Sequence, residues 1–265
     1  MAISEAVSTP LFINGEERTT GETLAVHDPH DGSLIGYAAA ASTQDALDAV
    51  AAAERAWPAW AALSAAERIE ICLKALETLP NDLDERAELL SRENGKIRFE
   101  ASIDLQVFVG RFHEAAKYAR DLDNPETIPG PPYKTTIRHV SQGVVTIIYP
   151  FNWPLAILAA SLPQALMAGN TVIAKPPPTT PLSSVLTLRQ VAARLPPGVL
   201  NVVTGQDAVL GPVVVGDPRI KHIAFTGSTA GGKRIMEMAS KNVTNVTARA
   251  GRQRPSDHPR RRRAR

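Results

Sequence analysis

Polar residues and glycines follow four apolar segments of the chain, each at the point where the segment ends: Asn152, Lys175, Gly205 and the pair Gly227-Ser228. An amide N–H such as that of Asn152 can stabilise the oxyanion that forms when a carbonyl carbon is attacked. A lysine can donate to ribose hydroxyls or to a phosphate. A Gly-Ser turn that opens a helix presents backbone N–H groups to a phosphate. These residue types suit a nucleotide bound beside a carbonyl substrate.

Strands are needed to position these residues, and short apolar runs precede all of them. We expect strands at 144–149, 170–175, 200–204 and 222–226, and residues 243–247 could begin a fifth. Helical segments of about ten to sixteen residues separate the runs, the length that a parallel crossover needs. The alternation predicts an α/β fold with an open, doubly wound, Rossmann-like parallel sheet. Ligands bind outside the carboxyl ends of such strands, so the candidate residues should gather along one edge.

Each candidate residue also has a structural interpretation. Asn152 lies between Pro150 and Pro154, where it would satisfy the backbone of a turn. Lys175 would be a solvated lysine at a strand exit, and Ser228 would cap the next helix. The residues alone leave these alternatives open.

Before this region the pattern is mostly helical. Residues 12–16 indicate a short strand and turn, and residues 27–32 a second turn. Helices are predicted over 42–60, from the capping box of Ser64 and Glu67 onward, over 82–94 and over 99–122. Four prolines within 124–132 indicate a connection, and alternation over 135–140 indicates a strand outside the main sheet.

Four ordered segments resemble the aldehyde dehydrogenase superfamily, over about residues 12–247. Residues 150–154, Pro-Phe-Asn-Trp-Pro, are similar to the family's Pro-Trp-Asn-Phe-Pro with the two aromatics exchanged. Residues 169–176 are similar to its Gly-Asn-Thr-Val-x-x-Lys-Pro, and residues 225–232 to its Phe-Thr-Gly-Ser-Thr-x-x-Gly. Residues 197–205 supply a fourth segment at the expected distance.

The resemblance implies that intact relatives oxidise a small-molecule aldehyde to a carboxylic acid with NAD or NADP. It implies that the amide of Asn152 is catalytic, and no metal site is expected. The cofactor-binding residues that it implies are Tyr149, Pro150, Phe151, Lys175, Pro176, Gly205, Phe225, Thr226, Gly227 and Ser228. Pro178 stands where the family often has a glutamate that favours NAD, so the choice between NAD and NADP stays open.

The resemblance also suggests how the chain is divided. We expect residues 1–123 to be an amino-terminal helical part of the cofactor-binding domain, and 124–142 a linker with an oligomerisation-arm strand. Residues 143–248 would be the Rossmann-like dinucleotide-binding part, and 249–265 an Arg-rich, disordered tail. The family forms homo-oligomers, an assembly that this chain need not share.

The family's nucleophilic cysteine and general-base glutamate have no counterpart here. Cys72 is the only cysteine, and it shares a predicted helical face with Ile69 and Leu73, where thiols are buried and inert. The family's glutamate lies in a Glu-Leu-Gly-Gly segment, whereas residues 248–252 are Ala-Arg-Ala-Gly-Arg. We therefore expect a dehydrogenase fragment without its catalytic domain, inactive alone. A residual NAD(P)-binding module and a non-functional truncated product are the alternatives.

The tail has a different composition from the rest. Residues 249–265 hold eight arginines and one acid, whereas the rest hold 21 basic and 26 acidic residues, a net charge of −5. A frameshift is our hypothesis, because skipping one base in suitable synonymous codons restores Glu-Leu-Gly-Gly-Asn. The coding DNA would test it. An anionic partner is the alternative, but the tail lacks aromatics for base stacking, so we do not expect nucleic acid to bind.

No secretory signal is visible, and the longest apolar stretch, residues 155–169, is interrupted by Pro163 and Gln164. A single cysteine excludes an internal disulfide and fits a reducing compartment. We therefore expect a cytoplasmic protein with no membrane partner.

Overall fold

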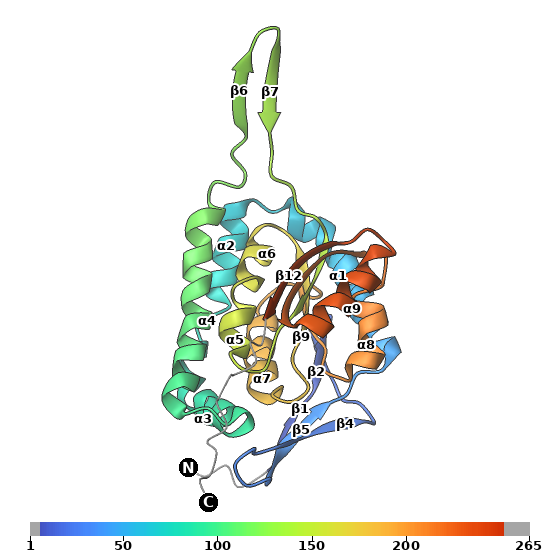
Figure 1. Cartoon of the computed structure of the whole chain (residues 1–265). Helices are drawn as coiled ribbons and strands as arrows, with labels where there is room; N and C mark the ends of the chain where they lie inside the picture. Colours follow the sequence, from blue (N-terminus) through green and yellow to red (C-terminus); the bar gives the residue numbers. More distant parts are fainter. Residues whose placement is uncertain (1–5, 252–265) are drawn as a thin grey trace, which may run out of the picture.

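A sheet of seven strands runs through the centre of the molecule, in the order β12-β11-β8-β9-β10-β2-β3 (Figure 1). The structure is a computed structural model, and it describes residues 6–251. The five parallel strands are β8 (Val144–Ile148), β9 (Thr171–Lys175), β10 (Leu200–Val202), β11 (Ile220–Ser228) and β12 (Asn245–Gly251). The first four correspond to the four predicted runs, β12 overlaps the possible fifth, and the predicted α/β sheet is confirmed.

Helices cover both faces of this sheet, because strand residues alternate between two apolar clusters. Val145 and Ile147 of β8 belong to one cluster and Val144 to the other. The first cluster holds residues of α2 (Ala65–Lys74), α4 (Arg98–Ala119), α5 (Pro154–Leu158), α6 (Leu162–Met167) and α7 (Leu182–Ala192). The second holds residues of α1 (Thr43–Ala62), α8 (Asp207–Val214) and α9 (Thr229–Ser240). The sheet is therefore doubly wound.

Local capping chemistry sets several helix ends. Ser64 caps α2 through the predicted box, in which its hydroxyl accepts from the Glu67 N–H and the Glu67 carboxylate accepts from the Ser64 N–H. Ser42 caps α1 in the same way. The helix α3 (Leu83–Asn94), preceded by the short 3₁₀ helix η1 (Leu79–Asp82), ends at Gly95 in the left-handed conformation, as predicted.

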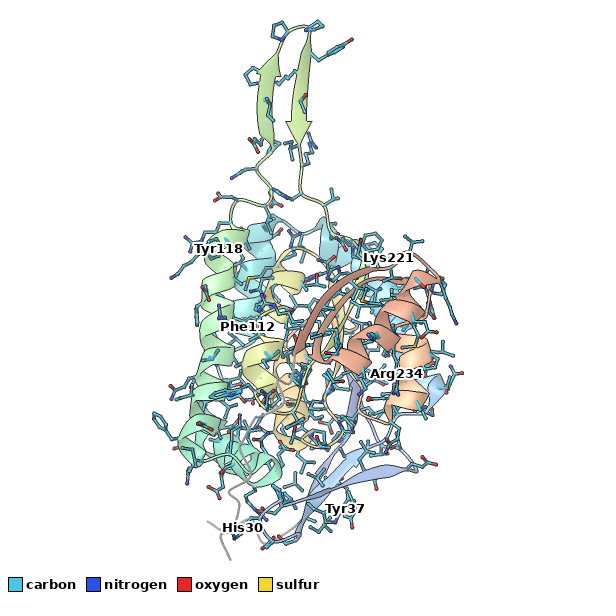
Figure 2. The ribbon with its side chains drawn as sticks, in the orientation of Figure 1. His30, Tyr37, Phe112, Tyr118, Lys221 and Arg234 are labelled. Carbon is cyan, nitrogen blue, oxygen red and sulfur yellow. The ribbon has the colours of Figure 1, made fainter. Side chains whose placement is uncertain are left out.

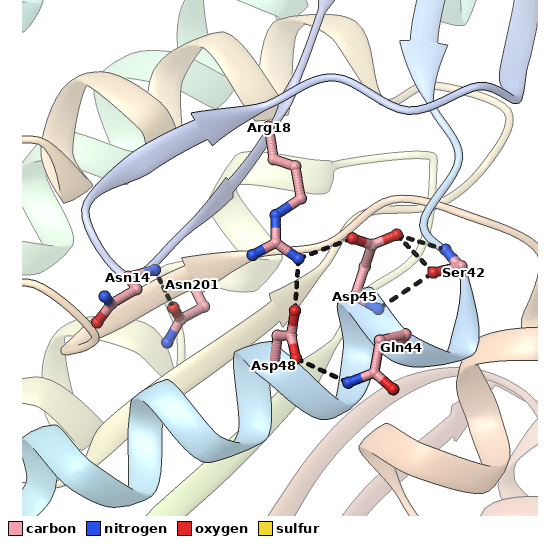
Figure 3. Close-up of polar contacts among 7 residues, drawn as sticks. All are labelled: Asn14, Arg18, Ser42, Gln44, Asp45, Asp48 and Asn201. Atoms are coloured by element: carbon pink, nitrogen blue, oxygen red, sulfur yellow. Dashed lines mark hydrogen bonds and ion pairs between the residues drawn. The ribbon is translucent and has the colours of Figure 1, made fainter.

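The amino-terminal residues contain more strand than the sequence predicted. β1 (Val7–Thr9), β5 (Leu34–Ala39) and β4 (Thr23–His27) form a separate three-stranded sheet. β2 (Leu11–Ile13) and β3 (Glu16–Arg18) extend the main sheet. Figure 3 shows how they are attached: Arg18 lies 2.8 Å from Asp45 and 2.7 Å from Asp48 of α1, and the Asn14 N–H donates to Asn201. The strands β2 and β3 are thus continuous with the main sheet, whereas β1, β5 and β4 are not.

Residues 124–132 are more than the predicted connection. β6 (Glu126–Gly130) pairs antiparallel with β7 (Tyr133–Ile137) in a hairpin that projects from the body (Figure 1). We predicted only a connection here, and the strand β6 was missed. Pro131 and Pro132 lie in the turn, where a missing N–H breaks no ladder bond, and Pro129 lies in a strand of a two-stranded sheet, where one edge is unpaired. The predicted strand at 135–140 is β7, which begins and ends earlier and does lie outside the main sheet.

β12 continues past the predicted boundary at residue 248. Arg249, Ala250 and Gly251 pair with Thr226, Gly227 and Ser228 of β11, so these three residues are in a strand, not in a disordered tail. The rest of the Arg-rich segment lies outside the described residues, and the frameshift stays a hypothesis. Within residues 6–251, no helix combines the length and the apolar character needed to cross a bilayer.

Candidate functional site

The register of the parallel strands places two predicted residues, Lys175 and Phe225, in one row with Ile148. Ile148 of β8 is paired with Lys175 of β9 on one side and with Phe225 of β11 on the other. All three stand at or near the carboxyl ends of their strands. The row therefore marks the sheet edge at which a doubly wound fold binds ligands.

A cavity of about 420 Å³ opens beside this row, between α8 and α9. Ile148, Lys175 and Phe225 line it from the sheet. Aliphatic residues of α8, Gly231 at the start of α9 and the charged side chains of Asp207, Arg234, Glu237 and Lys241 complete its wall. Such a mixture, mostly apolar with a few polar groups, is typical of a site for an organic ligand that carries polar substituents.

Lys175 is the most constrained charged group of the cavity. Its side chain is only 4% exposed, and its ammonium forms an ion pair with the carboxylate of Asp207, whose side chain is 79% exposed. Asp207 is the first residue of α8 and was not among the predicted residues. The interpretation of Lys175 as a solvated lysine is excluded, because the strand end buries it and a carboxylate compensates its charge.

At two positions of the predicted site, steric constraints explain why the residue is a glycine. Gly205 has φ +155°, and a Cβ there would lie 3.2 Å from the Ala41 nitrogen. A Cβ on Gly227 would lie 2.5 Å from Cζ of Phe225, so the ring packs where a larger residue would place its side chain. Both positions keep the backbone close to its neighbours, which suits a turn that approaches a ligand and equally suits tight packing.

Ser228 has the structural role that the sequence left open. Its hydroxyl accepts from the Gly231 N–H at 3.1 Å and caps α9. Ser228 and the first two residues of α9, Thr229 and Ala230, remain exposed at this edge. Capping does not decide whether a phosphate binds here, and the cofactor-binding role stays a prediction.

Asn152 lies on the exposed turn between β8 and α5, outside the cavity. Three side chains hold this turn. Asn94 donates to the Phe151 carbonyl at 2.6 Å, and Asp104 accepts from the Ala156 N–H at 2.6 Å. The ammonium of Lys96 lies 4.2 Å from the centre of the Trp153 ring. The turn is therefore anchored on both sides of Asn152 while the amide itself stays accessible.

The other predicted residues differ in their surroundings. Tyr149 is buried in the core, its pKa raised by burial, and its hydroxyl lacks a hydrogen-bond partner among the described residues. Pro176 is buried, Pro150 and Thr226 are half-buried, and Phe151 is exposed. Of the predicted residues, Lys175 and Phe225 line the cavity.

Comparison with known proteins identifies the family. The model of the aldehyde dehydrogenase family matches residues 16–256. The chain belongs to the aldehyde dehydrogenase family. A D-glyceraldehyde dehydrogenase (NADP(+)) from Picrophilus torridus is 35% identical over 246 residues, which is 91% of this chain and 50% of that protein. The chain spans about half the length of the curated relatives it matches.

Solved aldehyde dehydrogenase structures share the fold. Lactaldehyde dehydrogenase from Escherichia coli superposes with a TM-score of 0.88 at 30% identity, over 93% of this chain and 53% of that one. Betaine aldehyde dehydrogenase from Staphylococcus aureus, solved with NAD+, gives a TM-score of 0.87 at 27% identity, over 92% of this chain and 50% of that one. The resemblance that the motifs indicated is confirmed.

The cavity of this aldehyde dehydrogenase chain suits the adenosine end of a nicotinamide dinucleotide. The Lys175–Asp207 pair provides a donor and an acceptor side by side, as a ribose requires. The aliphatic wall from α8 and α9 suits a flat base, and Gly231 of α9 lines the cavity without a side chain. The residues therefore fit the cofactor class that the names of the relatives mention.

Cys72 has no part in this site. It is a buried residue of α2 in the apolar cluster shared with α4, and burial raises the pKa of its thiol to about 12. A thiol with so high a pKa is a poor nucleophile near neutral pH.

Proposed function

We propose that this chain is the dinucleotide-binding half of an aldehyde-oxidising dehydrogenase, and that it binds NAD or NADP along the carboxyl edge of its sheet. One observation carries the proposal: the row of Ile148, Lys175 and Phe225 lies beside a cavity that also contains Asp207. The family membership of residues 16–256 supports it.

Each residue has a distinct role in this proposal. Lys175 donates to the ribose, and the apolar wall of the cavity holds the adenine ring. The turn of Gly227-Ser228 and the first N–H groups of α9 face the pyrophosphate. Asn152, held by its anchored turn, would donate its amide N–H to the carbonyl oxygen of an aldehyde in a complete enzyme. The bound nicotinamide would accept a hydride there.

We propose further that the 265-residue chain alone does not turn over aldehydes. Covalent oxidation needs a thiolate beside the carbonyl carbon. The one thiol of this chain, Cys72 of α2, is buried in an apolar cluster and is not among the residues that line the cavity. Asn152 could polarise a carbonyl but could not form the covalent intermediate.

Isothermal calorimetry of the purified chain with NAD and NADP tests the binding proposal. We expect saturable binding of at least one cofactor, weakened about tenfold or more in Lys175→Met, which removes a charge-assisted hydrogen bond. Lys221→Met is the matched control, because Lys221 is exposed and its ammonium contacts Pro218 outside the cavity. Absence of saturable binding, or equal loss in both variants, would refute the proposal. Aldehyde-dependent cofactor reduction would refute the inactivity.

A specific observation also favours the alternative of a non-functional product. β12 stands at the edge of the main sheet, and six of its seven residues are exposed. Long exposed edge strands pair with other chains. Gel filtration and limited proteolysis would distinguish the two, because an aggregating product elutes early and is digested within residues 6–251. The cytoplasmic location stays a proposal that cell fractionation would test.

A further inference from the structure

We propose that Asp207 makes this site selective for NAD over NADP. The inference rests on the proposed function, since it assigns the choice between two cofactors at the same site. It starts from the contact between the Lys175 ammonium and the Asp207 carboxylate, which joins the ends of two neighbouring structural units, β9 and the start of α8.

The position of Asp207 makes its carboxylate available to a ligand. Its side chain is 79% exposed, whereas the lysine that it contacts is 4% exposed. One carboxylate oxygen contacts Lys175, and the residue lines the cavity together with Lys175. A carboxylate has about four lone-pair sites, so acceptor capacity remains for a second donor that enters the cavity.

The chemistry of the pair matches the ribose of NAD. Each hydroxyl of a vicinal diol both donates and accepts, so one can donate to Asp207 while its neighbour accepts from Lys175. The 2′-phosphate of NADP carries nearly two negative charges and has acceptors only. It would face a carboxylate that it cannot donate to and that repels it. An acid at the ribose favours NAD in dinucleotide-binding folds generally.

The acid that the family often places three residues after this lysine is absent here, since Pro178 stands at that position. Asp207 brings a carboxylate to Lys175 from a different element, 32 residues away along the chain. In our proposal this carboxylate binds the ribose in place of the absent glutamate.

Other charges line the cavity, and they define the competing outcome. Arg234 and Lys241 contribute two positive charges and Glu237 one negative charge, all from α9 (Figure 2 labels Arg234). An arginine near the ribose would instead bind a 2′-phosphate by donating hydrogen bonds to its oxygens. The residue that contacts Lys175 is Asp207 of α8 and not a residue of α9, so we place the ribose at the Lys175–Asp207 pair.

Calorimetric titration of the full chain with NAD and with NADP tests the inference. We expect NAD to bind at least about tenfold more tightly than NADP. Asp207→Asn should lower this ratio by about tenfold, mainly through tighter NADP binding, and Asp207→Glu should keep the preference. Asp217→Asn is a matched control, because Asp217 pairs with Arg219 outside the cavity. Thermal melting of each variant checks the fold.

The outcomes separate the two proposals. If neither cofactor binds, the proposed function fails and the inference falls with it. If both bind but NADP is preferred, or if Asp207→Asn leaves the ratio unchanged, dinucleotide binding stands and the role of Asp207 is refuted. A loss of NADP affinity alone in Arg234→Leu would show that the arginine, not the carboxylate, decides the cofactor.

Discussion

The ammonium of Lys96 lies 3.1 Å from the Asp104 carboxylate, and both side chains are buried at the base of the turn that carries Asn152. The other oxygen of Asp104 accepts from the Ala156 N–H, and Lys96 also lies over the Trp153 ring. Burial raises the pKa of Asp104, while the Ala156 N–H and Lys96 act in the opposite direction. This pair connects the start of α4 to the candidate catalytic turn.

Removal of the Lys96 ammonium should therefore destabilise the folded chain. Lys96→Met leaves the Asp104 charge buried without its partner, which should lower the free energy of unfolding by about 3–5 kcal/mol. The double variant Lys96→Met/Asp104→Asn removes both charges and should recover part of the loss. Urea unfolding measures both. Lys117→Met, on the exposed side of the helix α4 that carries Asp104, should change stability by less than about 0.5 kcal/mol. A Lys96→Met chain as stable as this control would contradict the prediction.

Glu93 should make stability depend on pH. It is a buried residue of α3 that accepts from the Leu182 and Ser183 N–H groups at the start of α7, and burial raises its pKa from 4.5 to about 8. The folded chain then holds a proton that the unfolded chain has released, so stability falls as pH rises from about 4.5 to about 8. The loss could reach ~5 kcal/mol over this interval.

Unfolding measured across this range in Glu93→Gln checks the prediction. The neutral amide has no proton to release, so the dependence on pH should flatten. Glu88→Gln is the control, because Glu88 is a partly exposed residue of the same helix that pairs with Arg98. It should keep the slope of the parent chain. A slope equally steep in Glu93→Gln would assign the dependence to other groups.

Local signals predicted much of the fold. The capping box of Ser64 and the stop at Gly95 depend on residues within one turn, and both helix ends are where the sequence indicated. The strands β8, β9 and β10 were visible as short apolar runs because their side chains are buried on both faces, whereas β12 is mostly exposed and gave only a weak signal. β4 was missed although Leu24 and Val26 alternate with exposed residues, a signal that a count of alternation would have found.

The candidate site was less predictable than the sheet. Lys175 was found because it ends a strand, whereas Asp207 contacts it only after α8 folds against the sheet. No local pattern marks such a contact. The hairpin of β6 and β7 was hidden by its prolines, which are rare in strands. Pro131 and Pro132 lie in the turn, and Pro129 lies in β6, a strand with one unpaired edge.

Cys72 should be unreactive in the folded chain. Its thiol is fully buried, with a pKa raised to about 12, so little thiolate forms near pH 8. A thiol-specific disulfide reagent should label it about a thousandfold more slowly than a free cysteine, and denaturant should restore full labelling. Rapid labelling without denaturant would place the thiol within reach of a substrate and would undermine the proposed inactivity.

The hairpin formed by β6 and β7 should bind a second copy of the chain. It exposes Ile128, Tyr133 and Ile137, yet an isolated two-stranded hairpin has little stability of its own in water. Ile128→Ser/Tyr133→Ser should therefore reduce self-association, seen by size exclusion with light scattering, without lowering the melting temperature. Tyr118→Ser, which removes an exposed aromatic from α4 (Figure 2), should leave association unchanged. A parent chain that is monomeric at every concentration, or a hairpin variant that still associates, would show that this arm is not an interface.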